Sequence, residues 1–182
     1  MTILAEIENL LATNGRRRYG LRDVSQLQHA LQAALLAEQQ HEPASLIAAA
    51  LLHDIGHMVH ELGENPAESR IDDRHEEHGH TWLTRHFGSD ITEPVRLHVA
   101  AKRYLCAVEP HYLSNLAPDS ITSLELQGGP MTDAEAATFR ASPHAQAAIH
   151  LRRFDDAAKV KDLPTPPVSH FMPYVAACLR SE

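Results

Sequence analysis

The chain has 182 residues, 43% of them apolar and only 5% aromatic, and a formal net charge of −8. This acidic balance argues against a general nucleic-acid-binding protein, and no apolar run approaches the roughly 18 residues of a membrane span. An interior filled mainly by Ala and Leu favours packed helices over a β-sandwich, so we expect an all-α protein.

The N-terminus and the cysteines indicate a cytoplasmic protein. The segment Met1–Glu8 is acidic and amphipathic, unlike a secretory signal peptide. Cys106 and Cys178 lie far apart and show no metal-binding spacing, so we expect both to be reduced core residues.

Three helical patterns occupy the first third of the chain. Apolar residues spaced three and four apart predict a helix over residues 3–11. A capping box at Ser25 predicts a second helix, over residues 25–40. A third, over residues 43–54, begins at a proline and ends in a His-Asp pair.

The rest of the chain continues as helices separated by Gly and Pro signals. We expect Gly88 to end a polar helix that starts at His75, and Thr92 with Pro94 to begin the next one. Further helix starts are predicted at Ser120, at a capping box on Thr132, at Ser142 and after Pro167. Since no segment keeps strand periodicity for long, we predict a single helical domain over residues 1–182.

The pair His53-Asp54 is the most informative feature of the sequence. It ends a helix rich in Ala and Leu, where an unpaired carboxylate would be costly to bury, so a metal cation is its natural partner. An imidazole offers one nitrogen to a metal, whereas a carboxylate can bridge two ions. The alternative is a helix that simply ends in polar residues at the surface.

Other candidate side chains lie on separate predicted helices. His29 and His98 have apolar neighbours, and an isolated histidine in such a place is ordinarily a core residue bonded to a backbone carbonyl. Asp155, next to another aspartate and two arginines, would ordinarily belong to a solvated face. The polar helix carries four histidines, of which at most one or two can face the bundle: His75, His78, His80 and His86.

Taken together, the order of these residues resembles the HD-domain mixed-valent diiron oxygenases, in the organophosphonate-cleaving branch related to inositol oxygenase. HD-domain proteins are helical metalloproteins named for their His-Asp pair. The resemblance covers most of the chain and rests on these motifs: Tyr19 ten residues before His29, Val24-Ser-Gln-Leu27, His53-Asp-Ile-Gly-His57, His98-x-x-x-Lys102 and Arg152-x-x-Asp155.

The resemblance implies two iron ions in the mixed-valent Fe(II)/Fe(III) state, with O2 as co-substrate. One iron would be held by His29, His53, Asp54 and Asp155, and the second by Asp54, His75 and His98. Imidazole and carboxylate ligands would also suit manganese or zinc, so the choice of iron comes from the family.

The resemblance also implies a set of substrate-binding residues. His57, Lys102 and Arg152 lie within one helical turn of proposed ligands, so their side chains should reach the same cavity and bind a dianionic phosphonate. Ser120 would add a hydroxyl and a helix N-terminus, although an ordinary N-cap is the alternative. Tyr19 would cover the open iron position until substrate displaces it, and Lys102 would also serve in catalysis.

The implied reaction is O2-dependent cleavage of the C–P bond of a 1-hydroxy-2-(amino or trimethylammonio)ethylphosphonate-type substrate. It would release phosphate and glycine or glycine betaine, and an upstream hydroxylase would supply the hydroxyl group. Where the aminophosphonate-cleaving member has a glutamate, this chain has Arg22, followed by Asp23. Either Arg22 faces solvent and Asp23 or another acid pairs the cation, or the tail is not a free amine. Because an arginine facing inward would repel an ammonium group, we favour an N-methylated or otherwise altered tail.

Two other functions remain open at this point. A metal-dependent HD phosphohydrolase acting on a nucleotide or phosphate ester would need one ion and would leave His75 and His98 outside the ligand set. A non-enzymatic helical sensor of a phosphorylated ligand would be expected to have lost some ligands, whereas this chain retains all six candidates.

Overall fold

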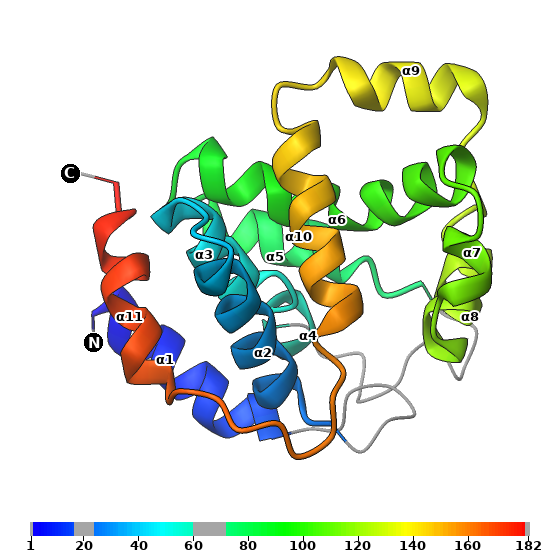
Figure 1. Ribbon diagram of the computed structural model, residues 1–182. Coiled ribbons are helices and arrows are strands. Elements are labelled where there is room, and N and C mark those ends of the chain that lie inside the picture. Colours follow the sequence, from blue (N-terminus) through cyan, green and yellow to red (C-terminus); the bar gives the residue numbers. More distant parts are fainter. Residues whose placement is uncertain (1, 17–23, 60–71, 181–182) are drawn as a thin grey trace.

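Helices joined by turns make up the computed structural model, which describes residues 2–16, 24–59 and 72–180 (Figure 1). In chain order the helical elements are α1 (Ile3–Thr13), the 3₁₀ turn η1 (Asn14–Arg16), α2 (Gln26–Gln39), α3 (Ala44–Leu52), α4 (Gly56–Val59), α5 (His75–Leu83), α6 (Ser89–Val108), α7 (Tyr112–Asn115), α8 (Pro118–Leu126), α9 (Asp133–Ala141), α10 (Ala145–Ala157) and α11 (Val168–Ala177). Phe87 and Leu179 form an isolated antiparallel bridge, and the described ranges contain no longer strand. The all-α prediction is confirmed.

Local sequence signals explain where several helices begin. At α2, the Ser25 hydroxyl accepts a hydrogen bond from the Gln28 backbone, and the Gln28 side chain accepts one from the Ser25 backbone. Thr132 and Glu135 make the same reciprocal pair at the start of α9. Each pair satisfies two backbone N–H groups that a helix start leaves without partners, so both predicted capping boxes are formed.

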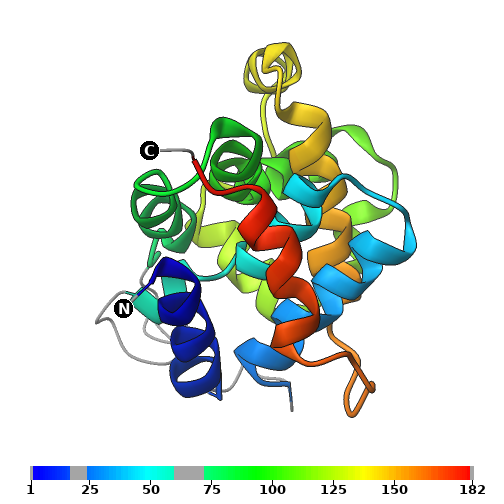
Figure 2. The same cartoon turned by 90° about the vertical axis from the view of Figure 1, so that its left-hand side faces the viewer.

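The apolar helix α3 is the most enclosed element of the fold. Every residue from 46 to 52 is buried, because α2, α6, α10 and α11 pack around this helix. Figures 1 and 2 show α11 beside α1 at one edge of the molecule and α10 on the opposite side of α3. A helix enclosed in this way carries the polar residues at its C-terminal end into the interior, and these residues are His53 and Asp54.

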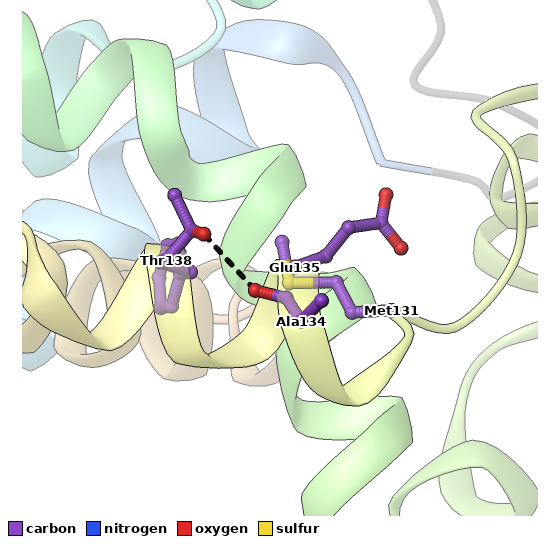
Figure 3. A pocket seen from close by; sticks show the side chains of 5 residues that line it. Met131, Ala134, Glu135 and Thr138 are labelled. Carbon is purple, nitrogen blue, oxygen red and sulfur yellow. Dashed lines mark hydrogen bonds between the residues drawn. The ribbon is translucent and has the colours of Figure 1, made fainter.

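A smaller apolar cluster lies where α9 packs on α6 and α10. Its centre is the contact between the rings of Tyr104 and Phe139, whose centroids are 4.9 Å apart. Figure 3 shows an open hollow on α9, in which the Thr138 hydroxyl donates to the Ala134 carbonyl at 3.0 Å. The hollow is lined by Met131, Ala134, Glu135, Thr138 and Phe139, none of which is a predicted site residue.

Two features of α6 differ from the prediction. Gly88 does not end the preceding helix but is the N-cap of α6, and Pro94 lies inside α6 instead of at its start. A proline there removes one intrahelical hydrogen bond. The side chains of Ile91 and Val95 on either side are fully buried, and this packing offsets the unfavourable local preference.

The two cysteines are free thiols, but their placement corrects the expectation of core residues. Both Cys106 and Cys178 are only half-buried. Partial burial still raises the pKa of each thiol, because it disfavours the thiolate.

Candidate metal centre

Five helices bring the six predicted ligand residues to one place in the interior. All six are at most 9% exposed. His29 lies within α2, His53 directly follows α3 with Asp54 beside it, His75 begins α5, His98 lies within α6, and Asp155 lies within α10.

Each of the four imidazoles is oriented by an oxygen atom at its Nδ1. The distances from Nδ1 to oxygen are 2.8 Å for His29 to the Ala158 carbonyl, 2.9 Å for His53 to the Ala50 carbonyl, 2.6 Å for His98 to the Val95 carbonyl and 2.9 Å for His75 to the Asp73 carboxylate. Carbonyl and ionised carboxylate oxygens only accept hydrogen bonds, so Nδ1 carries the proton in every ring. In its neutral form each ring therefore keeps a lone pair on Nε2, the state that a metal ion requires.

The four Nε2 atoms face one another in two pairs. The Nε2 atoms of His29 and His53 are 3.0 Å apart, and those of His75 and His98 are 3.2 Å apart. Two nitrogen lone pairs at such a distance repel each other unless a proton or a metal cation lies close to both. Each pair therefore needs a proton or a metal cation between its two Nε2 atoms.

Asp54 lies between the two pairs and turns one oxygen toward each. Its Oδ2 is 3.5 Å from Nε2 of both His29 and His53, and its Oδ1 is 3.5 Å from His75 and 3.7 Å from His98. Among the described residues Oδ2 has no hydrogen-bond partner. A buried carboxylate oxygen left without a partner is costly, and a cation near Nε2 would remove that cost.

Asp155 extends the first pair, because its Oδ1 lies 3.3 Å from Nε2 of His29. Two groups of donors result, and within each the ligand atoms lie no more than 4.8 Å apart: His29, His53 and Asp155 in one, and Asp54, His75 and His98 in the other. Such mixtures of imidazole and carboxylate fit iron, manganese or zinc. The donor set can therefore hold two metal ions, with Asp54 shared between them.

The ionisation of Asp54 also favours a metal cation. Although burial opposes its charge, Asp54 has a pKa held well below the usual range by His53 and the surrounding imidazoles. Burial and the neighbouring His75 lower the pKa of His98 well below its ordinary value. Burial acts in the same sense on His75, but the hydrogen bond to Asp73 and the charge of Asp54 raise its pKa to about 9. Asp54 thus stays ionised at neutral pH, whereas His75 is protonated there and has to lose its Nε2 proton before it can bind a metal ion.

Gly56 explains how α4 can lie directly against the start of α5. A β-carbon on Gly56 would stand 1.9 Å from the carbonyl oxygen of His75, far inside any real contact. Gly79 belongs to the same contact, since a β-carbon there would be 3.3 Å from the Gly56 nitrogen. The close approach of these two backbones brings His75 within reach of Asp54.

Buried lysines lie beside the centre. Nζ of Lys102, a residue only 2% exposed, donates to Oγ of Ser123 at 2.8 Å. Nζ of Lys159 lies 3.3 Å from Oγ of Ser120 and 3.3 Å from Oδ1 of Asp155. Burial, together with the nearby guanidinium of Arg152, lowers the pKa of Lys102 to about 7.

Arg152 adds a third buried cation and links it to the ligand set. Its Nη1 lies 2.7 Å from Oδ2 of Asp155, and its other nitrogens contact Asp156 and the hydroxyl of Tyr112. Although burial opposes the charge, Asp155 and Asp156 raise the pKa of Arg152 well above its ordinary value. This cation therefore stays charged at any working pH.

Other predicted residues differ in how much the structure says of them. His57 is partly exposed at the edge of the centre, with Nε2 4.0 Å from Oδ1 of Asp54. Ser120 is buried as the third residue of α8, whose N-cap is Ala117, so the alternative of an ordinary serine N-cap is wrong. Tyr19 and Arg22 lie outside the described residues.

The polar helix α5 presents a single histidine to the centre. His75 is buried, whereas His78 is exposed and His80 bonds Glu93 at 3.1 Å on another side of the helix. This agrees with the expectation that at most one or two of its histidines can face the bundle.

Sequence reasoning missed four residues beside the centre: Asp73, Tyr112, Ser123 and Lys159. Spacing offered a signal for two of them. Lys159 follows Asp155 by four residues, and Ser123 follows Ser120 by three, so each pair shares a helical face or its continuation.

The chain matches the HD domain family over residues 27–141, a span that includes five of the six predicted ligands. It therefore belongs to the HD-domain family. It is also 43% identical to the 1-hydroxy-2-(trimethylamino)ethylphosphonate dioxygenase (glycine-betaine-forming) of Leisingera caerulea, over 95% of this chain and 88% of the relative. With the hydroxymethylphosphonate dioxygenase of Gimesia maris it shares 45% identity, over 94% of this chain and 85% of the relative. An uncharacterized protein of Acanthamoeba polyphaga mimivirus is 32% identical, over 91% of this chain and 76% of the relative.

These relatives place the chain, within the HD-domain family, among the phosphonate dioxygenases, as the sequence motifs predicted. The protein is thus an oxidoreductase whose His and Asp clusters can bind metal. Among the described helices, none has both the length and the apolar character needed to cross a bilayer. The single domain over residues 1–182 stays a prediction.

Proposed function

We propose that this enzyme uses two iron ions and O2 to cleave the C–P bond of an α-hydroxyphosphonate, releasing phosphate and a carboxylic acid. The observation that carries the proposal is the carboxylate of Asp54, whose two oxygens face two separate pairs of imidazole nitrogens. The relatives at 43% and 45% identity support the reaction, since both are named as dioxygenases of hydroxylated phosphonates.

The proposed reaction balances without an external reductant. R–CH(OH)–PO3²⁻ and O2 give R–COO⁻, HPO4²⁻ and H⁺, so the four electrons lost by the carbon are accepted by O2. A mixed-valent iron pair, when bound, supplies the redox chemistry that activates O2. The six predicted ligands would hold it, with Asp54 shared.

Three cations of the chain itself suit the phosphonate group. Lys159 presents an ammonium group beside the centre, and Arg152 contributes a guanidinium. Lys102, with its pKa of about 7, is partly protonated at neutral pH and would be fully charged beside a dianionic phosphonate. Asp155 partly balances them, but its charge would be committed to a bound metal, which leaves the cations for a dianionic substrate. We assign Lys102 to phosphonate binding and catalysis, with Ser120 and His57 at the same site. Tyr19 remains proposed as the residue that covers the open iron position.

The two relatives named as dioxygenases differ in the tail of their substrates, one carrying a trimethylamino group and the other none. Arg22, in place of an acidic residue, argues against a free amine in this chain's substrate. The hydroxyl on the carbon next to phosphorus has to be installed before cleavage. We therefore also propose a separate hydroxylase that acts on the parent phosphonate.

The phosphohydrolase alternative explains less of the centre. A hydrolase with one ion would need His29, His53, Asp54 and Asp155, and would leave His75 and His98 without a task. The Nε2 atoms of these two rings face each other, and the second oxygen of Asp54 is directed at them, which favours a second ion.

The test is an anaerobic incubation of the iron-loaded enzyme with three candidates: hydroxymethylphosphonate, 1-hydroxy-2-(trimethylamino)ethylphosphonate and its primary-amine analogue. O2 is then admitted, and phosphate and the acid product are measured. We expect phosphate only after O2 is added, with the primary amine the poorest substrate. Phosphate release without O2, or from a phosphate ester, would support the hydrolase instead.

A further inference from the structure

The carboxylate of Asp73 joins two histidines of different function. Its Oδ1 lies 2.9 Å from Nδ1 of His75, and its Oδ2 lies 2.7 Å from Nδ1 of His57. The aspartate is only 8% exposed, so water competes little for these oxygens. One buried carboxylate thus holds a proposed metal ligand and a proposed substrate-binding residue together.

The backbone fixes this carboxylate at the start of α5. Asp73 lies two residues before His75, and its Oδ1 also faces the backbone N–H of His75 at 3.4 Å. Between them, Arg74 adopts the left-handed conformation with φ 47° and ψ 40°, a conformation that a residue with a side chain rarely adopts. This tight turn folds the Asp73 side chain back toward the ring that follows it.

The hydrogen bonds determine which nitrogen of each ring faces the centre. An ionised carboxylate only accepts, so both Nδ1 atoms carry protons and both Nε2 atoms point away from Asp73. Nε2 of His75 then lies 3.2 Å from Nε2 of His98, and Nε2 of His57 lies 4.0 Å from Oδ1 of Asp54. The two rings stack, with centroids 4.1 Å apart and planes inclined by 19°.

We propose that Asp73 is a positioning residue that sets the tautomer and orientation of His75 and His57 at once, and so couples the second metal position to the substrate side of the centre. This inference rests on the proposed function for the tasks of the two histidines. The assignment of the two tautomers rests on the contacts of Asp73 with the two Nδ1 atoms, whatever the tasks of the rings.

Glu76 provides a matched control on the same helix. Its Oε2 lies 3.7 Å from Nδ1 of His75, beyond hydrogen-bond distance, and has no hydrogen-bond partner among the described residues. Glu76→Gln removes a negative charge close to His75 but leaves both hydrogen bonds of Asp73 in place. A purely electrostatic role of Asp73 would therefore be reproduced by Glu76→Gln, whereas a positioning role would not.

The experiment compares wild type, Asp73→Asn and Glu76→Gln in the metal-free and Zn²⁺-loaded forms. Imidazole ¹⁵N NMR reports the tautomer of each assigned histidine, and Zn²⁺ titration reports the affinity for the first and second ion. An asparagine has one accepting oxygen, so Asp73→Asn can keep at most one of the two hydrogen bonds. We expect at least one ring to move its proton to Nε2 and the affinity for the second Zn²⁺ to fall about 10- to 100-fold. Glu76→Gln should change neither.

Three results would overturn the inference. The first is a wild-type Zn²⁺-loaded protein in which His57 or His75 carries its proton on Nε2; this measurement needs no variant to fold. The second is unchanged tautomers and Zn²⁺ affinity in Asp73→Asn, and the third is an equal loss in Glu76→Gln. Failure of the proposed function would show differently, as wild-type iron enzyme that releases no phosphate on admission of O2.

Discussion

The backbone of Gly56 lies so close to His75 that a β-carbon at position 56 would stand 1.9 Å from the His75 carbonyl oxygen. Glycine in the motif His53-Asp-Ile-Gly-His57 is therefore a packing requirement. It sets the distance between the helix that carries His57 and the helix that begins with His75.

Gly56→Ala should push α5 away and destabilise the protein by about 1–3 kcal/mol, the usual cost of overpacking. Because His75 moves with α5, binding of a second Zn²⁺ should weaken as well. Urea unfolding and Zn²⁺ titration measure the two effects. Gly88→Ala is the matched control, since its β-carbon would stand 2.8 Å from Oδ1 of Asp90, the end of a side chain that can move, and not against a backbone. Equal effects of both substitutions would show that the close contact of Gly56 is not what matters.

His98→Ala should remove one donor of the second metal position and leave the first position intact. We expect one tightly bound metal ion per chain and a loss of O2-dependent phosphate release of at least about 100-fold, since changes outside the ligand set alone cost 10- to 100-fold. Metal analysis and a phosphate assay test this. His78→Ala, on the exposed side of α5, should behave as wild type. Full activity of His98→Ala would make His98 a structural residue.

Lys102→Met keeps most of the side-chain volume but removes the ammonium group. A charge-assisted hydrogen bond contributes about 1.5–3 kcal/mol, so KM for the phosphonate should rise roughly 10- to 100-fold. Metal content should stay unchanged. Arg103→Met is the control, because Arg103 faces the Gly129 carbonyl and Glu135 instead. A KM that does not change in Lys102→Met would contradict phosphonate binding by Lys102.

Metal binding should stabilise the fold. A ligand that binds only the folded state adds about 2.7 kcal/mol at a concentration 100 times its Kd. Zn²⁺ should therefore raise the Tm, and a chelator should return it to the metal-free value. In His53→Ala this increase should shrink, because a donor of the first group is lost. If Zn²⁺ left the Tm of the wild type unchanged, the two donor groups could not be a metal centre.

The helices that the sequence predicted best are those with explicit start signals. Ser25 and Thr132 lead reciprocal capping boxes, which depend on residues three apart and so can be read locally. Pro94 misled the prediction, because the burial of its neighbours keeps α6 continuous across it. The four-residue helices α4 and α7 are too short to show a periodic pattern.

The residues of the candidate site likewise divide into those with a local sequence signal and those without one. His53, Asp54 and His98 stand out within apolar helices, and their order along the chain could be matched to a family. Asp73 could not be found in this way, because it lies before the first turn of α5 and has no periodic context. Asp73 matters because the turn at Arg74 folds its carboxylate back toward the rings of His57 and His75.

His53 and His98 each hydrogen-bond, through Nδ1, the backbone carbonyl three residues earlier in the chain. The carbonyl is that of Ala50 for His53 and that of Val95 for His98. The group that orients each ring is thus main chain, and it travels with the histidine if the helix shifts or rotates. Replacing neighbouring side chains cannot delete it. Residues around these two histidines can therefore be substituted, and the interior repacked, while Nε2 stays the nitrogen that each ring offers to a metal.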